Sequence, residues 1–240
     1  MGIDVIDDCW VVFNRDHDNL VVTCANKNPT ELMLDGMRTQ SIFRRVKAKV
    51  RSGDGNPLIY ALKGKKNFRI NPKEVSCFLP DFNLILSKAM LGANFDLIVP
   101  MPSSHGISEI LAKRAVRVIR TGVLSSDLLR KKINREVLAE IRNTNFHKRH
   151  RFLAKTLRRR LEKSNGASSF SMKDVDNKLR TYIEPMVITQ SPQVAPSRIL
   201  LVDDLISSGA TLCSARDSLL TVFPDAHIEG LSLLSKIKSR

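Results

Sequence analysis

Short apolar runs, each ending in a polar or small-residue loop, recur in the second half of the chain. The three clearest runs lie at residues 94–101, 198–204 and 228–234. Short, mainly apolar runs of this length are typical of buried parallel strands. Apolar residues at helical spacing occupy residues 81–91, 111–119 and 211–222. Because strands alternate with helices, the pattern predicts an α/β fold around a parallel sheet.

The first 57 residues have a different pattern. Apolar runs at 10–13 and 20–23 flank a polar stretch at 14–19, which predicts a β-hairpin. Asn28, followed by Pro29 and Glu31, has the composition of a helix start, and we expect a helix from there into the basic stretch 44–51. A loop composition at 52–57 separates this N-terminal extension (1–57) from a main domain (58–240).

A basic insertion interrupts the main domain at about residues 130–196. Residues 130–163 hold 13 Lys or Arg against three Glu, and Leu153, Leu157 and Leu161 recur at every fourth position. This spacing predicts a helix with one apolar stripe and a basic outer face. Loop compositions at 164–169 and 190–196 indicate that the stretch between them is a mobile insertion.

The most informative segment is 199–212, where an apolar strand leads to Asp203 and Asp204, then a loop of small residues, then a helix. Ligands of open parallel sheets bind beyond the carboxyl ends of the strands. A small-residue loop at a helix N-terminus suits a phosphate, and paired carboxylates beside it can accept hydrogen bonds from the two hydroxyls of a ribose. The segment therefore predicts a ribose 5-phosphate site. Its phosphate-binding candidates are Ser207, Ser208, Gly209, Ala210 and Thr211.

This segment resembles the phosphoribosyl pyrophosphate (PRPP) motif of type I phosphoribosyltransferases, with Ser207 and Ser208 where two threonines are usual. Residues 58–64, 95–102, 111–113 and 127–131 resemble, in the same order, segments of the ComF-type members of that superfamily. The resemblance implies the type I phosphoribosyltransferase fold, catalytic roles for Asp203 and Asp204, and Mg²⁺ carried with the diphosphate. It places Ser103, Ser104 and His105 near the pyrophosphate, and Arg130 and Lys131 on an arm that closes over it.

Two departures from the ComF pattern accompany this resemblance. The long polar run with an Arg-Gly pair that is usual after the Pro-x-Pro is replaced by residues 103–106. The zinc ribbon that often precedes these proteins would need more cysteines than Cys9 and Cys24. All four cysteines are far apart without a C-x-x-C pair, so we expect no metal site made by the protein alone.

Charge adds a possible class of partner. The formal net charge of +15 favours a polyanion, and a second basic block, residues 38–73, holds 11 Lys or Arg against one Asp. DNA or RNA is the polyanion that this charge favours. Because aromatic residues make up only 5% of the chain, we expect the protein to contact nucleic acid mainly through its phosphates. The candidate contact residues are Arg158, Arg159, Arg160, Arg44 and Arg45.

Other chemistries fit the sequence less well. Ser103 and His105 could suggest a nucleophile and base, but near-adjacent residues rarely face each other and no elbow motif surrounds them. The stretch 16–18 (Asp-His-Asp) could bind a metal, although it has an ordinary turn composition. An acidic start without an export signal, and no apolar stretch of about 18 residues, favour a soluble cytoplasmic protein without membrane contact.

Two functions follow from the sequence. The first is a Mg²⁺-dependent phosphoribosyltransferase, a glycosyltransferase that binds PRPP or another nucleotide-like ligand. The second is a non-catalytic protein of the same fold that binds nucleic acid or a protein partner, in DNA uptake or in antiviral defence, since proteins of this fold accompany some retron reverse transcriptases.

Overall fold

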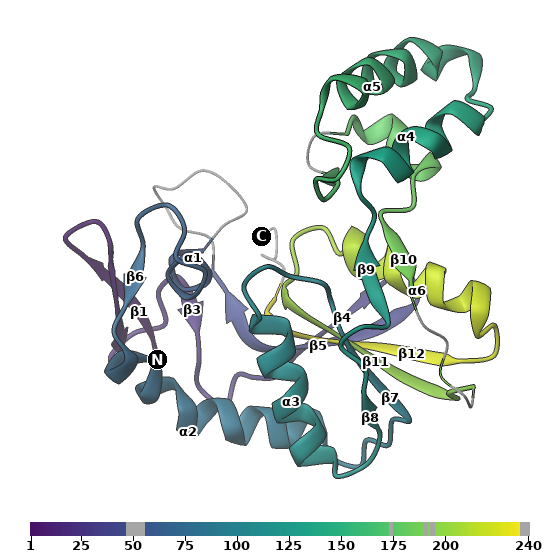
Figure 1. The fold of residues 1–240 in the computed structure, drawn as a ribbon. Coiled ribbons are helices and arrows are strands. Elements are labelled where there is room, and N and C mark those ends of the chain that lie inside the picture. Colours follow the sequence, from purple (N-terminus) through teal and green to yellow (C-terminus); the bar gives the residue numbers. More distant parts are fainter. Residues whose placement is uncertain (47–55, 173–174, 190–191, 193–194, 236–240) are drawn as a thin grey trace.

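The computed structural model describes residues 1–46, 56–172, 175–189, 192 and 195–235. The architecture is α/β, as the sequence predicts, with a mixed sheet, helices on both of its faces and a helical appendage that stands away from it (Figure 1). None of the helices in these ranges is long and apolar enough to cross a membrane.

The main sheet has seven strands within the described ranges, in the order β3-β5-β12-β11-β7-β8, with β4 also paired to β5. Its strands are β3 (Val21–Val22), β4 (Thr30–Leu34), β5 (Met37–Arg45), β7 (Leu97–Pro100), β8 (Val123–Leu124), β11 (Arg198–Leu205) and β12 (His227–Leu234). The run from β5 to β8 is parallel, whereas β3 and β4 pair antiparallel with β5. The three apolar runs singled out in the sequence form the centre of this sheet.

Strand β11 is buried on both faces, because helices cover both sides of the sheet. Leu200 and Val202 belong to one hydrophobic core, and Ile199 and Leu201 belong to the other, as the alternation of side chains along a strand requires. The first core is built with α1 (Pro57–Leu62), α2 (Pro72–Ala89) and α3 (Ile107–Ile119), and the second with α6 (Ala210–Val222).

The side of the sheet on which the next strand is added reverses between β7 and β11. From β7 it passes through α3 to β8 on one side, whereas from β11 it passes through α6 to β12 on the other. Because α3 and α6 cover opposite faces, the loops that follow β7 and β11 diverge at the carboxyl edge, the position at which open α/β sheets generally form a ligand crevice. This is where open α/β sheets bind their ligands.

The predicted N-terminal hairpin is wrong in its pairing. Strand β2 (Trp10–Asn14) pairs antiparallel with β1 (Gly2–Ile6) and parallel with β6 (Arg69–Ile70), whereas β3 pairs with β5. The loop between β1 and β2 has three residues, 7–9, and Asp7 and Asp8 within it have positive φ, as the two central residues of a type I′ turn do. The polar stretch 14–19 is the connection to β3 and not a hairpin turn.

The helix expected from Asn28 is also wrong, because residues 30–45 form the β4–β5 hairpin. Asp35 and Gly36 both have positive φ at its turn, and an Asp-Gly pair is a strong hairpin signal that outweighs the helix-start composition. Residues 47–51 and most of 52–57 lie outside the described ranges. Strand β5, from the expected N-terminal extension, pairs with β12, from the expected main domain. The two segments therefore share one sheet, and position 57 does not separate two structural units.

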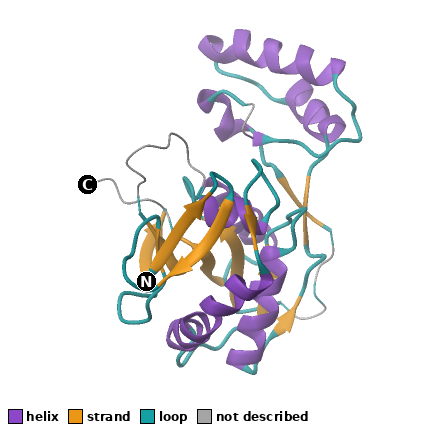
Figure 2. Ribbon diagram, turned by 90° about the vertical axis from the view of Figure 1, so that its left-hand side faces the viewer, coloured by secondary structure: helices purple, strands orange, loops and turns teal. Residues whose placement is uncertain are grey.

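The basic insertion is a helical appendage on a two-stranded ribbon. The ribbon consists of β9 (Leu129–Lys131) and β10 (Met186–Ile188), which are antiparallel. Between them lie α4 (Asn134–Asn143), η1 (Lys148–His150), α5 (Arg151–Lys163) and η3 (Asn177–Tyr182). The expected basic helix is therefore divided into α4 and α5, and Figure 2 shows the helices of the appendage grouped apart from the sheet. These elements share a hydrophobic core of their own that includes Val137, Leu157 and Leu179.

Candidate functional site

Asp203 and Asp204 lie at the carboxyl end of β11, where the crevice opens. Adjacent strand residues point to opposite faces, so the two carboxylates have different surroundings. Asp204 is 5% exposed, and its Oδ2 is 2.6 Å from the Nζ of Lys63. Asp203 keeps some exposed surface, and its Oδ1 accepts a hydrogen bond from the Asp204 N–H at 2.8 Å. The two carboxylates thus have different partners: the Lys63 ammonium for Asp204 and a main-chain N–H for Asp203.

Lys63 comes from the end of α1, far from Asp204 in sequence. Asn56 caps this helix by accepting from the Leu58 N–H, and Pro57 occupies its first turn. The Lys63 N–H closes the last turn, which places the side chain at the carboxyl edge of the sheet. Lys63 was not among the candidate residues, although its segment resembles the Lys-bearing segment of ComF-type proteins.

The surroundings of Asp203 raise its pKa to about 7. Burial is the main cause, because it disfavours the charged form, and the neighbouring carboxylate of Asp204 acts in the same direction. The Asp204 N–H, Lys63 and Lys131 oppose this rise. Asp203 therefore exchanges its proton near neutral pH, which suits a group that handles hydroxyl protons.

The loop after β11 has the features of an anion site. Gly209, the N-cap of α6, has φ of +87°, and a Cβ there would lie 2.6 Å from the Leu34 Cδ2, so glycine fits both the backbone and the space. Ser208 and Thr211 are exposed on either side of it, and the Ser208 Oγ accepts from the Ala210 N–H at 3.3 Å. No side chain of the N-cap residue covers the positive end of α6.

The loop after β7 forms the other side of the crevice. Ser103 and Ser104 are exposed, and α3 follows with Gly106 as an N-cap that has no side-chain hydrogen bond. In the first turn of α3 the buried Ser108 Oγ has no hydrogen-bond partner within the described part of the chain. Two helices whose N-cap residue is a glycine therefore follow adjacent parallel strands.

His105 lies close enough to the other site residues to respond to their charges. Its pKa is lowered, first by burial and then by the positive charges of Lys65 and Lys63, while the Asp204 carboxylate opposes this shift. The imidazole is thus mainly neutral at pH 7. The structure brings the loop at 103–105 and the end of α1 to the same carboxylates.

Arg130 and Lys131, the two candidates for the arm, have different roles, because they are neighbours on β9 and their side chains point to opposite sides. The Arg130 guanidinium makes two hydrogen bonds to the Glu136 carboxylate, at 2.7 and 2.6 Å, and holds the ribbon to α4. Lys131 is exposed, and its positive charge reaches Asp203. Lys131 is therefore the member of the pair that faces the site.

The nucleic-acid candidates differ in how far their side chains are exposed. Arg45 is 4% exposed and donates to the Ile206 carbonyl at 2.6 Å and to the Ser235 carbonyl, so it supports the loop after β11 and has no surface for a polyanion. Arg44 is partly exposed on β5. Arg159 and Arg160 are exposed on α5, where Arg158 is bound to Glu162 at 2.9 Å.

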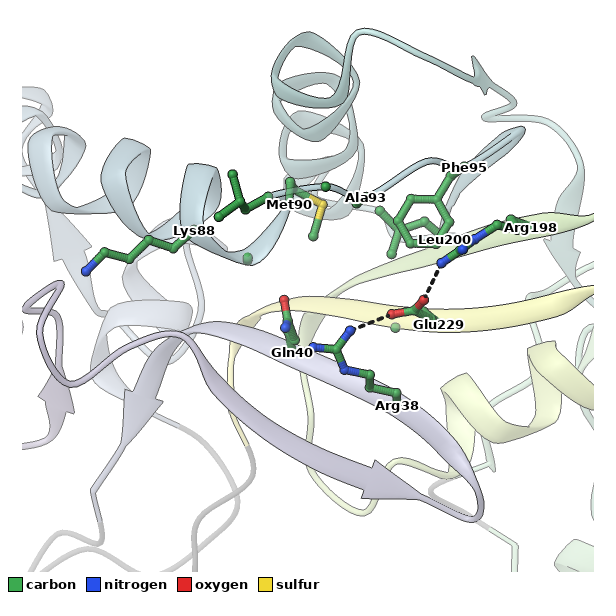
Figure 3. A pocket seen from close by; sticks show the side chains of 13 residues that line it. Arg38, Gln40, Lys88, Met90, Ala93, Phe95, Arg198, Leu200 and Glu229 are labelled. Carbon is green, nitrogen blue, oxygen red and sulfur yellow. Dashed lines mark hydrogen bonds and ion pairs between the residues drawn. The ribbon is translucent and has the colours of Figure 1, made fainter.

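A pocket of about 160 Å³ lies at the opposite, amino edge of the sheet (Figure 3). Its charged residues have partners within the protein. Glu229 is 3.0 Å from Arg198 and 3.4 Å from Arg38, and Arg198 also lies over the Phe95 ring. Lys88 donates to the Ala25 carbonyl at 2.8 Å. These contacts satisfy the charges within the protein, so we assign the pocket no ligand.

The described residues contain no group of three or more His, Cys, Asp or Glu side chains that could hold a metal ion. In the Asp-His-Asp stretch, His17 contacts Asp4 at 3.1 Å and Asp18 contacts Lys27 at 2.9 Å. At the carboxyl edge, Asp203 and Asp204 could supply only part of a coordination shell. Such a pair suits an ion that arrives with phosphate oxygens and keeps several waters.

Comparison with known proteins adds no relative: no protein-family model matches this sequence, and a search of curated proteins found no match.

Proposed function

We propose that the carboxyl edge of the sheet binds a ribose 5-phosphate group, and in particular PRPP. The observation that carries this proposal is the pair Asp203 and Asp204 between the N-termini of α3 and α6, each of which has a glycine as its N-cap. PRPP has an anionic group at each end, with a vicinal diol between them. The 5-phosphate would bind at residues 207–211, the diphosphate at 103–106, and the diol at the carboxylates.

The surrounding charges support an anionic ligand. Lys63, Lys65 and Lys131 act on the carboxylates or on His105, and they give the crevice a positive rim. Ser108 adds a buried hydroxyl with no partner in the described part of the structure, beside the loop that would take the diphosphate. The carboxyl edge therefore offers a buried hydroxyl that a ligand could satisfy.

The proposal includes phosphoribosyl transfer as the reaction and a type I phosphoribosyltransferase fold as its scaffold. In this reaction the bond between C1 and the diphosphate oxygen breaks, the acceptor bonds to C1, and diphosphate leaves with the bonding electrons. The protein holds the ribose through its hydroxyls while positive charge develops at C1, and needs no nucleophile of its own. Mg²⁺, bound with the diphosphate and a carboxylate, would neutralise the leaving group.

Calorimetry with ribose 5-phosphate, and with PRPP plus Mg²⁺, tests this proposal. Asp204→Asn should weaken both ligands by about 5- to 150-fold, because a hydrogen bond to a charged acceptor contributes roughly 1 to 3 kcal/mol. Thr211→Val, on the exposed first turn of α6, should weaken both ligands without disturbing the buried Lys63–Asp204 pair.

Asp225→Asn is the control, since it removes an exposed carboxylate beyond the far end of α6 and should leave both affinities unchanged. Equal affinities in the wild type, Asp204→Asn and Thr211→Val would exclude the ribose 5-phosphate assignment. Binding of inorganic phosphate as tight as that of ribose 5-phosphate would show an anion site without ribose recognition.

A further inference from the structure

The outer side of α5 carries a line of cations. Arg151, Lys155, Arg159 and Lys163 are all exposed and follow one another at every fourth position. Residues at this spacing lie one above another on the same side of a helix, about 6 Å apart along its axis. The buried residues of the helix, Ala154, Leu157 and Leu161, face the core of the appendage instead.

The carboxylates of the neighbouring helices do not neutralise this line. Glu162 binds Arg158 and Arg142, at 2.9 and 3.0 Å, and Glu136 binds Arg130. Within the described ranges, no carboxylate lies at ion-pair distance from the members of the line. Like charges at this helical spacing repel one another. The arrangement therefore costs stability unless a polyanion binds there.

An aromatic side chain lies beside the line. Phe152 is 78% exposed, next to Arg151 and three residues before Lys155. A phenyl ring left in water offers a surface on which an unpaired nucleobase can stack, and such a contact is compatible with any base. Duplex nucleic acid has its bases stacked internally and would leave the ring unused.

We propose that this face of α5, defined by Arg151, Phe152, Lys155, Arg159 and Lys163, binds single-stranded nucleic acid. The cations contact successive phosphates, and one base stacks on Phe152. A lipid surface is a poorer match, because an interfacial helix inserts its apolar face, and that of α5 is buried in the appendage. The proposal uses residues of the appendage alone and does not depend on the ribose site.

Fluorescence anisotropy of a labelled 20-nucleotide oligo-dT, measured over a salt series, tests it. The double variant Lys155→Gln/Arg159→Gln should bind at least about tenfold more weakly at low salt, with a log–log salt slope reduced by about 1.4, because each phosphate contact contributes about 0.7 for single strands. Lys73→Gln/Arg117→Gln removes the same charge from exposed positions on α2 and α3, and should change affinity less than twofold.

Phe152→Ala should weaken oligo-dT by at least about fivefold with an unchanged salt slope, since stacking is not ionic. Circular dichroism establishes that each variant is folded. Equal losses of oligo-dT affinity in the two double variants would show that the effect depends on net charge alone, and would overturn the proposal. Tighter binding of duplex DNA, polyglutamate or phosphatidylserine vesicles than of oligo-dT would also overturn it and identify a different partner class.

Discussion

Asp203 and Asp204 are adjacent and chemically identical, yet their surroundings make them different groups. Asp204 is buried against Lys63, whereas Asp203 has its pKa raised to about 7. Burial and the neighbouring charge both disfavour a second ionised carboxylate. Asp204 is thus held in a buried ion pair with Lys63, whereas Asp203 is a proton acceptor near neutral pH.

The first prediction concerns the free energy of unfolding as a function of pH. A carboxyl whose pKa is raised on folding stabilises the native state below its ordinary pKa of 3.8, and this contribution disappears as the pH rises through about 7. Compared with Asp203→Asn, the wild type should therefore lose stability between about pH 4 and 7, by at most about 1.4 kcal/mol per pH unit. Urea denaturation of both proteins at several pH values measures the difference, and a constant difference would contradict the prediction.

At the scale of elements, the ribbon β9–β10 connects the appendage to the sheet, and the ion pair between Arg130 and Glu136 holds the ribbon to α4. Glu136 accepts hydrogen bonds from Arg130 and from the Ile133 N–H. These two contacts, the guanidinium first, lower the pKa of Glu136 to about 2. The Glu136 carboxylate, which caps the first turn of α4, therefore also fixes the start of the appendage.

The second prediction is that Arg130→Met returns the Glu136 pKa most of the way toward its ordinary value, observable by NMR titration of the side-chain carboxyl. In the wild type this group stabilises the fold above about pH 4.5, and its contribution is lost as the pH falls to about 2. Lys131→Met is the matched control, since its side chain faces the other side of the ribbon. An unchanged Glu136 pKa in Arg130→Met would mean that the Ile133 N–H, and not the guanidinium, determines the shift.

At the scale of the whole molecule, the two edges of the sheet have different chemistry. Arg198 begins β11 at the amino edge, and Asp203 lies five residues further along the same strand. This separation is about 17 Å at 3.3 Å per residue. At the amino edge, Glu229 forms ion pairs with Arg38 and Arg198. At the carboxyl edge lie the N-termini of α3 and α6 and the Asp203 carboxyl, which exchanges its proton near neutral pH.

The third prediction follows from this difference. Arg198→Ala should lower stability by about 0.5 to 1 kcal/mol, because it removes a partly exposed ion pair with Glu229, and should leave ribose 5-phosphate affinity unchanged. Urea denaturation and calorimetry on the same preparation give both values. A tenfold change in affinity would show that the amino-edge pocket is coupled to the ligand site.

The segment 199–212 shows what local sequence determines. A continuous apolar run, two carboxylates, small residues and a helix pattern are each properties of near neighbours, so the strand, the loop and α6 are predictable without a partner. The α/β class follows for the same reason. The helix expected from Asn28 into the stretch 44–51 is wrong over its described part, because two local signals conflict there and the Asp35-Gly36 turn outweighs the helix-start composition.

Contacts between distant segments were decided only by tertiary structure. The sequence does not specify that Lys63 meets Asp204, that Arg45 is buried under the loop after β11, or that β5 lies beside β12. Strand pairing and ion pairing depend on which surfaces the whole chain brings together, and many pairings satisfy the same local pattern. The sequence thus determined the chemistry at the end of β11 and the positive charge of the insertion. Only the fold decided which lysine reaches the carboxylates and which cations of α5 remain unpaired.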